Sequence, residues 1–150
     1  MECVAIGVCR SPYRQVGDAP RQGRLVDTES EIEVFPEYRA GLSDVERCSH
    51  LIVLYWQDRA DRTALSATPP GEVRSRGVFS TRSPNRPNPI AFSVVDLLSI
   101  EDGVLRVRGL DALDGSPLLD IKPYSSAVDA IEGAGVDWMR QMSPHPVGRD

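Results

Sequence analysis

The stretch at residues 77–89 reads GVFSTRSPNRPNP and combines two arginines with three prolines in thirteen residues. Proline fixes φ, removes a backbone donor and moves the preceding residue out of the helical region, so this stretch is predicted to be a stiff loop. Arg82 and Arg86 lie four residues apart on it. Because a guanidinium group is always charged and pairs bidentately with carboxylate or phosphate, the loop could hold charges at fixed positions. The alternative is a structural loop whose arginines are solvated.

Two further loops carry groups of the same kind. Residues 20–23 read PRQG and residues 111–115 read DALDG, and each adjoins a predicted strand, as binding loops on a rigid scaffold do. With residues 82–89 they offer guanidinium groups, backbone donors and two carboxylates. This set suits a zwitterionic, cationic ligand with ribose hydroxyls better than a bare phosphate. No GxxxxGK[ST], GxGxxG or GxSxG motif occurs, so the sequence does not indicate a P-loop, a dinucleotide-binding or a serine-nucleophile site.

Short strands separated by turn residues would have to position these loops. The run LIVLYW is apolar, β-branched and aromatic, which predicts a strand buried on both faces. A hairpin is predicted with its turn at residues 101–103, and Asp114-Gly115 predicts a second tight turn. The predicted strands are residues 3–8, 31–35, 51–56, 90–100, 104–107 and 118–124.

Few helices are predicted. Ser43 and Glu46 match a capping box, which predicts a short helix from Ser43 to about Cys48. Residues 136–142 show a weak helical pattern, and residues 58–70 are predicted to form a polar loop or helical turn. Many short strands with little helix indicate a mainly β fold, a small antiparallel β-barrel or sheet with a few short helices.

The length of 150 residues fits one domain, with a core at about residues 3–125, a tail at 126–150 and no extra C-terminal domain. The composition is that of a soluble globular protein, and no apolar run is long enough to cross a membrane. The first residues lack the basic start of a signal peptide.

The three cysteines, Cys3, Cys9 and Cys48, are an odd number and show no CxxC spacing, so we expect buried free thiols in a reducing cytoplasm. We expect no metal, since only His50 and His145 could complete a zinc site.

The charge is unevenly distributed. The net charge of −5 argues against a protein that coats nucleic acid generally. Between Glu72 and Ile90, however, four arginines face one acid, and such a patch could meet a specific RNA or an anionic small molecule. Those arginines are Arg74, Arg76, Arg82 and Arg86.

Two long motifs, GVFSTRSPNRPNPI and GLDALDGSPLLDIKPY, resemble the TsaA-like family, also called TrmO or YaeB. The segments IGVCRSPY, PRQ and SHLIVLYW resemble the same family, so that the likeness runs from about Ile6 to Tyr124. The resemblance implies a β-barrel methyltransferase that binds S-adenosylmethionine as a homodimer. The best-understood members methylate N6 of threonylcarbamoyl-adenosine beside the tRNA anticodon.

The resemblance also implies roles for individual residues. Arg82 would lie against the cofactor, backbone groups near Phe92 would meet its adenine, and the acidic turn 111–114 would take its ribose or amino group and complement the sulfonium. Methyl transfer needs no metal, because the protein mainly places the reactants in line. The cofactor-binding residues implied are Gln22, Gly23, Arg24, Asp58, Arg59, Arg82, Phe92, Asp111, Ala112, Leu113 and Asp114.

Substrate contacts are less specific. Arg86, Asn88 and Lys122, the only lysine, are expected to orient the substrate and its phosphates, although they could instead brace the loop by hydrogen bonds to backbone groups, Asn88 in particular. Tyr124 could stack on a base or be a plain core tyrosine. The catalytic base, if there is one, is not indicated.

The sequence departs from the family pattern in places that leave the substrate open. Ala91-Phe92 stands where the family usually has Gly-Leu or Gly-Met, which makes that wall bulkier, and Ser116 replaces Thr. The sequence ends about 26 residues after DIKPY, where longer members carry a further domain. Methylation of tRNA is the first hypothesis. The alternatives are methylation of another RNA or a small molecule, and a non-catalytic dimeric module that binds the cofactor or a nucleotide.

Overall fold

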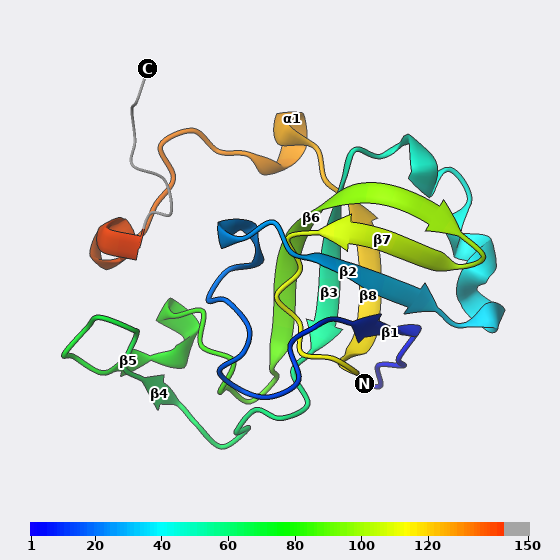
Figure 1. Ribbon diagram of the computed structural model, residues 1–150. Helices are drawn as coiled ribbons and strands as arrows, with labels where there is room; N and C mark the ends of the chain where they lie inside the picture. The colour runs from blue at the N-terminus through cyan, green and yellow to red at the C-terminus, as the bar shows by residue number, and fades with distance from the viewer. Residues whose placement is uncertain (143–150) are drawn as a thin grey trace.

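A closed, six-stranded antiparallel barrel forms the centre of the molecule in the computed structural model, which describes residues 1–142 (Figure 1). Around the barrel the strands follow the order β1-β2-β7-β6-β3-β8. A separate two-stranded sheet, β4 and β5, projects from one side. The prediction of a mainly β fold with a small antiparallel barrel is confirmed. The strands are β1 Gly7–Arg10, β2 Glu29–Val34, β3 His50–Trp56, β4 Ser66–Ala67, β5 Arg76–Gly77, β6 Ile90–Glu101, β7 Val104–Arg108 and β8 Pro117–Pro123.

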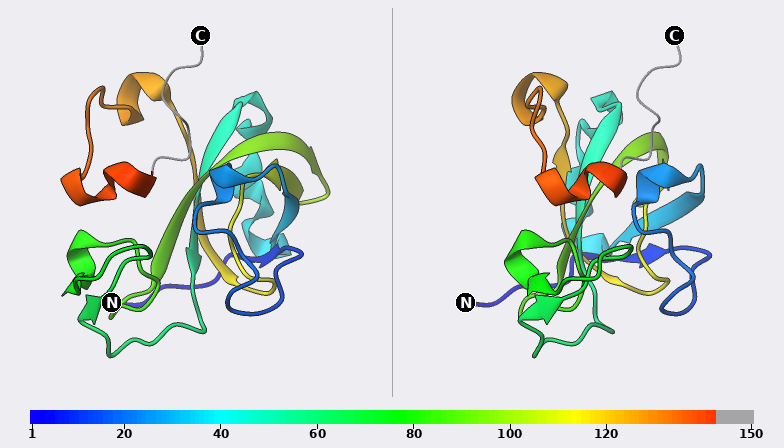
Figure 2. Two further views of the ribbon diagram at one scale, coloured as in Figure 1. Left: turned by 60° about the vertical axis from the view of Figure 1, so that its left-hand side comes forward. Right: turned by 90° about the vertical axis from the view of Figure 1, so that its left-hand side faces the viewer.

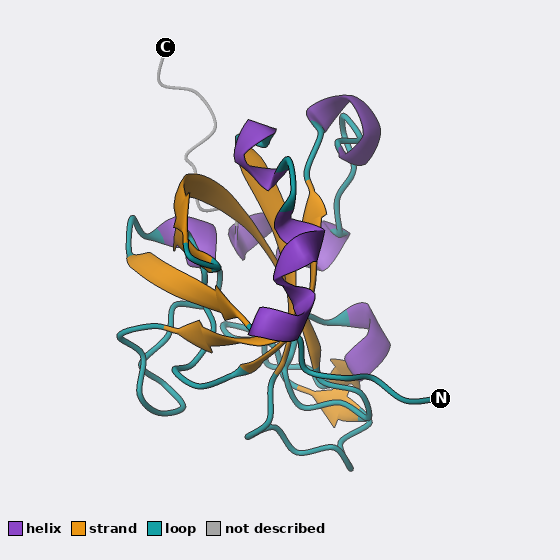
Figure 3. Cartoon of the chain, turned by 90° about the vertical axis from the view of Figure 1, so that its right-hand side faces the viewer, coloured by secondary structure: helices purple, strands orange, loops and turns teal. Residues whose placement is uncertain are grey.

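The helical segments are short and most are 3-10 turns. Figure 3 shows η2 and η3 lying over one side of the barrel, where Leu42, Val45 and Cys48 pack against its core. In both views of Figure 2, η5 lies next to the hairpin of β4 and β5. The helical segments are η1 Gly23–Leu25, η2 Pro36–Leu42, η3 Val45–Arg47, η4 Val78–Ser80, α1 Ser126–Asp129 and η5 Asp137–Met142.

The barrel interior is filled by alternate residues of its strands, since successive strand side chains point to opposite faces. On β3 the side chains of Leu51, Val53 and Tyr55 are buried in this core. The outer face of β3 is covered only in part: Ile52 is buried but Leu54 and Trp56 are half-buried, so the prediction of two buried faces holds for the first half of the strand. The other buried core residues are Cys9, Ile32, Val34, Val95, Leu105, Val107, Leu110, Ala112 and Leu118.

Both predicted turns are confirmed. Asp102 (φ 50°) and Gly103 (φ 75°) carry positive φ between β6 and β7, as a two-residue hairpin turn requires. Gly115 has φ 84°, and the backbone N–H of Ser116 donates to the carbonyl of Leu113 at 3.1 Å. Glycine at this position meets the positive φ without steric cost.

The start of the first strand and the capping box were predicted wrongly. β1 begins at Gly7 rather than at Cys3, because residues 1–5 are exposed and pair with no strand. Ser43 is the C-cap of η2, and Asp44, with φ 69°, precedes η3 without a side-chain capping bond. The predicted short helix is present as η3, which ends at Arg47, but it begins at Val45 and Ser43 does not cap it. The helical pattern at residues 136–142 is confirmed as the 3-10 segment η5.

The prediction that the cysteines are buried is right for one of the three residues. Cys9 is buried in the barrel, whereas Cys48 is half-buried and Cys3 is exposed in the N-terminal segment. All three are free thiols. Among residues 1–142, no three His, Cys, Asp or Glu side chains gather where they could hold a metal ion, and His145 lies outside the described residues. No helix in the described part of the chain is long and apolar enough to cross a membrane.

Candidate functional site

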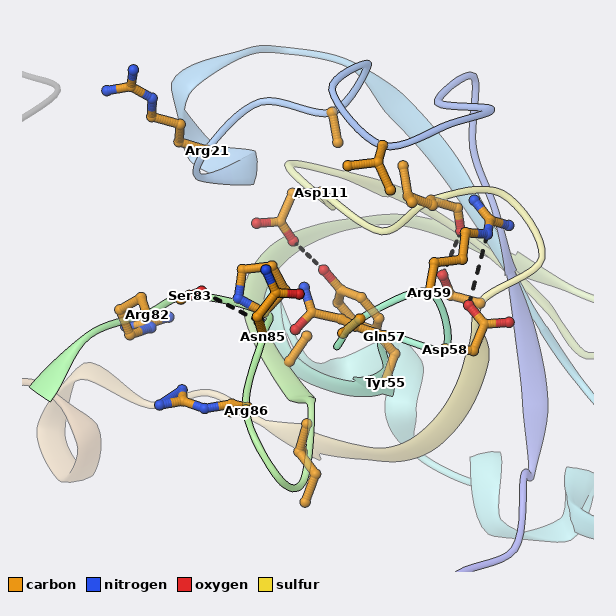
Figure 4. Close-up of a pocket in the computed structure, with 18 of the residues that line it drawn as sticks. Arg21, Tyr55, Gln57, Asp58, Arg59, Arg82, Ser83, Asn85, Arg86 and Asp111 are labelled. Atoms are coloured by element: carbon orange, nitrogen blue, oxygen red, sulfur yellow. Dashed lines mark hydrogen bonds and ion pairs between the residues drawn. The ribbon is translucent and has the colours of Figure 1, made fainter. Parts of the chain in front are cut away.

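The three loops singled out in the sequence meet at one pocket of about 320 Å³ beside the barrel. Its walls come from the loop before η1, the end of β3, the proline-rich loop, the first residues of β6 and the turn before β8. A volume of this size is at the lower end for small-molecule sites, which are roughly 300–1,000 Å³. Figure 4 shows that these side chains converge from segments far apart in the sequence.

Eight of the residues named as cofactor or substrate contacts line this pocket, and seven do not. Those that line it are Gln22, Asp58, Arg59, Arg82, Arg86, Phe92, Asp111 and Leu113. Those outside its lining are Gly23, Arg24, Asn88, Ala112, Asp114, Lys122 and Tyr124.

Gly23 and Ala112 lie behind the pocket wall because both are packed in the interior. A Cβ on Gly23 would come within 1.8 Å of the Gly109 carbonyl oxygen, so the two backbones touch at this point. Ala112 is fully buried in the barrel core. The structure gives both residues a packing role.

Polar partners draw the side chains of Arg24 and Asp114 elsewhere. Arg24 approaches Asp96 at 3.4 Å and faces a separate hollow that Tyr124 also lines. Asp114 accepts a hydrogen bond from the Ser11 backbone N–H at 3.1 Å and so fixes its own loop.

Two predicted substrate contacts also have partners of their own. Lys122 forms an ion pair with Asp120 at 3.1 Å on the barrel exterior. The side-chain oxygen of Asn88 accepts a 3.5 Å hydrogen bond from Arg62, which agrees with the bracing alternative for Asn88.

Arg82 and Arg86 differ in what their guanidinium groups contact. The Arg86 group donates to the backbone carbonyls of Thr81 (3.1 and 3.3 Å) and Val78, and so holds the proline-rich loop together. The Arg82 side chain is exposed and makes one long hydrogen bond, 3.5 Å, to the Phe92 carbonyl, while its guanidinium carbon lies 5.9 Å from the Phe92 ring centroid. Arg82 is therefore the one of the pair that has hydrogen-bond donors available to a ligand.

Asp111 is fixed at the inner end of the pocket by two hydroxyl groups. Its Oδ1 accepts hydrogen bonds from Tyr55 (2.7 Å) and Ser93 (2.6 Å), and Figure 4 shows the first of these. No described residue bonds to its Oδ2. Burial, and then the Asp111 carboxylate, raise the pKa of Tyr55 above its ordinary value, so that Tyr55 stays a donor. Burial followed by Asp111 also raises the pKa of the Cys9 thiol to about 12.

Arg59 joins two of the pocket loops. Its guanidinium group donates to the carbonyl of Asp114 at 2.6 Å and to that of Arg14 at 3.2 Å. Its Nε lies 3.9 Å from the carboxylate of Asp58. Because most of its donors are engaged, we assign Arg59 mainly to positioning the loops.

The pocket therefore offers a free guanidinium group at Arg82, a carboxylate at Asp111 and the aromatic ring of Phe92. This donor set fits a zwitterionic ligand that also has a flat aromatic part, because each part finds a complementary group.

Several lining residues were not predicted from the sequence: Arg21, Tyr55, Gln57, Asn85 and the hydroxyl of Ser93 behind them. Tyr55 was assigned to the core, and only the barrel closure shows that its hydroxyl reaches the pocket. The sequence did indicate the direction of this side chain, because alternation along LIVLYW places Tyr55 on the same face of the strand as Leu51. Arg21 and Asn85 lie inside motifs that had been quoted, but nothing local distinguished them.

Comparison with known proteins gives consistent relatives. The family model described as the tRNA-methyltransferase O N-terminal domain matches residues 8–130. An S-adenosyl-L-methionine-binding protein of Archaeoglobus fulgidus is 56% identical over 84% of this chain and 91% of its own length. A probable S-adenosyl-L-methionine-binding protein of the same organism is 55% identical over 93% of this chain, which spans only 38% of that relative.

A solved structure shows the same fold. The crystal structure of TrmO from Pseudomonas aeruginosa superimposes with a TM-score of 0.74 at 34% identity, covering 90% of this chain and 60% of that one. The present chain thus spans less than two thirds of that enzyme. The family match covers most of the barrel and all the pocket loops, and the chain belongs to the TrmO family, that of the tRNA-methyltransferase O N-terminal domain.

Proposed function

We propose that this protein binds S-adenosylmethionine in the pocket and transfers its methyl group to N6 of threonylcarbamoyl-adenosine next to the tRNA anticodon. The observation that carries the proposal is that Arg82 and Asp111, which come from two different motifs of the family, line the same pocket. The printed names of the relatives, which refer to S-adenosylmethionine and to tRNA methyl transfer, support the same function.

The residues can divide the work of binding between them. Arg82 has free donors for a carboxylate, and its planar fork suits that partner. The Phe92 ring and the adjoining backbone suit a flat heterocycle. Asp111, fixed by Tyr55 and Ser93, presents a negative charge that complements a cationic centre or accepts hydrogen bonds from hydroxyl groups.

When bound, S-adenosylmethionine supplies an electrophilic methyl group on a sulfonium centre. The substrate nitrogen gains the methyl carbon as the carbon–sulfur bond breaks, and its proton leaves to water. The protein's part is to hold the two reactants in line, which can supply several kcal/mol of the barrier reduction, up to roughly 7–11 in model systems. The stiff loop and the locked Asp111 serve this purpose because neither has to rearrange.

The decisive experiment measures methyl transfer from labelled S-adenosylmethionine to bulk tRNA, with and without the threonylcarbamoyl modification, by nucleoside mass spectrometry. Label on the modified adenosine alone is the expected result. Cofactor binding without any label would overturn the proposed substrate, and no binding in calorimetry would overturn the cofactor as well.

A second candidate is a non-catalytic module, because the two relatives from Archaeoglobus fulgidus are named as binding proteins. Methylation of another RNA or of a small molecule is the third. Turnover separates the enzymes from the module. Salt dependence separates a tRNA substrate from a small one, since log K for binding through several phosphates falls steeply with log salt.

We further propose that the protein is a cytoplasmic homodimer. Leu65, Val73 and Phe79 are at least two-thirds exposed around the projecting β4–β5 sheet, and a second copy would cover them. Light scattering on the purified protein tests the dimer. A monomer at micromolar concentration would contradict it.

A further inference from the structure

A second cavity of about 270 Å³ adjoins the first. Its walls come from the segment after β4, the proline-rich loop and the C-terminal segment η5. In Figure 2, η5 lies beside the β4–β5 hairpin in both views. Trp138 and Met139 of η5 line this cavity, and so do three prolines of the other walls, Pro69, Pro70 and Pro84.

The two cavities share part of their lining. Arg21, Gln22 and Arg82 face both, as do Ser83 and Pro84 of the proline-rich loop. These five residues form a wall that the two cavities share, which we call the shared wall. Ligands bound in the two cavities would therefore be neighbours, with only these side chains between them. Group transfer needs the reacting atoms within about 3–3.5 Å of each other, so the methyl group would have to pass at the edge of this shared wall.

The indole of Trp138 is held in place from behind. The Arg76 guanidinium carbon lies 4.6 Å from the centroid of the Trp138 ring, and Arg76 also pairs with Glu72 at 3.4 Å. Cation–π contact of this kind fixes the plane of the ring. The Nε atom of Arg76 is buried and has no hydrogen-bond partner among the described residues. The Arg76 side chain is therefore held by its contact with the indole and by its ion pair with Glu72.

We infer that this second cavity is the acceptor subsite and that Trp138 stacks on the purine base that receives the methyl group. The inference rests on the proposed function, which puts the cofactor in the first cavity. The base would lie on the face of the indole that Arg76 does not cover. Its hydrogen-bonding edge would meet the hydroxyl groups of Thr68 and Ser83.

The chemistry of the walls favours an unpaired RNA base over other acceptors. An aromatic ring and proline side chains on the walls of one cavity make an apolar slot that suits a flat heterocycle, and protein aromatics commonly stack on splayed-out bases. The two positive groups that line this cavity, Arg21 and Arg82, are both on the wall that it shares with the first cavity, and they suit the phosphates beside such a base.

Trp138 can report its own occupancy, because the chain has only one other tryptophan, Trp56. In a Trp56→Phe variant all tryptophan emission comes from Trp138. We expect saturable quenching when this variant is titrated with an anticodon stem-loop RNA that contains threonylcarbamoyl-adenosine. The same RNA with an abasic site at that position should leave the emission nearly unchanged. Equal quenching by both RNAs would overturn the inference.

Kinetics give the second readout. Trp138→Ala should raise the KM for tRNA about 5- to 100-fold, the loss expected for one stacked base. The Kd for S-adenosylmethionine in calorimetry should stay within about twofold, given only an indirect contact across the shared wall. Trp138→Phe should recover most of the loss and Trp138→Leu little of it, because only an aromatic ring stacks. Tyr38→Ala, which removes an exposed aromatic on η2, is the matched control and should change neither constant.

The outcomes separate this inference from the proposed function. Normal transfer by Trp138→Ala with an unchanged KM would overturn the subsite and leave the function standing. If the wild-type protein transfers no methyl group, the fluorescence titration still decides: base-dependent quenching supports a nucleobase site, and its absence overturns it. If Trp138→Ala does not fold, the Phe and Leu variants and the titration carry the test.

Discussion

Two arginines on one loop illustrate how residues of one type divide between structure and binding. In the sequence, Arg82 and Arg86 are equivalent members of a proline-rich motif. In the structure, the guanidinium group of Arg86 donates to the backbone carbonyls of Thr81 and Val78, whereas that of Arg82 makes one long hydrogen bond and has other donors available. Arg86 therefore braces the loop while also lining the pocket, and its role in orienting the substrate stays a prediction.

The pair of alanine variants tests this division. Arg82→Ala should weaken S-adenosylmethionine binding about 10-fold or more, because a charge-assisted bond worth roughly 1.5–3 kcal/mol is lost. Its melting temperature should stay within a few degrees of wild type. Arg86→Ala should instead lower the free energy of unfolding by about 1–3 kcal/mol, since the Thr81 carbonyl loses its guanidinium donor. Calorimetry and urea unfolding measure the two effects. The reverse pattern would contradict the assignment.

Asp111 offers a test that separates charge from hydrogen bonding. Asp111→Asn removes the charge but retains an oxygen that can accept from Tyr55 and Ser93, so the fold should be preserved while cofactor affinity falls about 10-fold, or roughly 1.4 kcal/mol. Asp111→Ala should additionally destabilise the protein by about 1–3 kcal/mol for each hydroxyl left without an acceptor. Unchanged affinity in the Asn variant would show that the carboxylate charge plays no part.

At the scale of elements, the pocket depends on how closely η1 approaches the turn that follows β7. The backbones of Gly23 and Gly109 touch there, and a Cβ on Gly23 would also come within 3.0 Å of the Asp111 backbone nitrogen. The PRQG loop and the DALDG turn can therefore approach this closely only because Gly23 has no side chain. Glycine in PRQG is explained by packing rather than by ligand contact.

Gly23→Ala should therefore force the two loops apart. We expect a loss of about 1–3 kcal/mol in the free energy of unfolding, as for overpacked sites, together with weaker cofactor binding. Gly41→Ala is the matched control, because no atom lies within 4 Å of the Cβ it would add, and its effect should stay within about 0.5 kcal/mol. Equal stabilities of the two variants in denaturant would contradict the close approach.

At the scale of the whole molecule, the barrel surrounds groups that can ionise only at high pH. Burial raises the pKa of the Cys9 thiol from 9.0 to about 12 and that of Tyr55 above its ordinary value, with Asp111 adding to both. Both groups are neutral when protonated. Above the unfolded-state pKa the unfolded chain binds fewer protons than the folded one, so the stability that these groups contribute is lost as pH rises.

Stability should accordingly fall between about pH 9 and 12, with a slope from the thiol that approaches 1.4 kcal/mol per pH unit. Cys9→Ala removes the thiol part and should flatten the slope of unfolding free energy against pH, whatever its effect at neutral pH. Cys48→Ala, at a half-buried site, is the control and should keep the wild-type slope. Parallel curves for wild type and Cys9→Ala in urea titrations would disprove the contribution.

The sequence by itself determined the features that depend on neighbouring residues. The continuous apolar run LIVLYW predicted β3, and Asp-Gly pairs predicted both turns, including that of the β6–β7 hairpin. The proline-rich motif predicted a stiff loop and, with the DALDG motif, the family. Each of these follows from backbone preference or side-chain period, which are local properties. The failures were local too: the capping box was overridden at Asp44, where the chain turns to bring η3 onto the barrel.

Only the tertiary structure decided which of the motif residues share a pocket. The bonds from Tyr55 and Ser93 to Asp111 join residues 56 and 18 positions apart, and they exist because barrel closure brings β3, β6 and the turn before β8 together. The same closure buries Gly23 and Ala112 and turns Arg24 and Tyr124 to another hollow. The packing of η5 outside the barrel brings Trp138 and Arg82 to the lining of one cavity. Contacts of this kind depend on strand register and packing across the whole chain, and no local pattern encodes them.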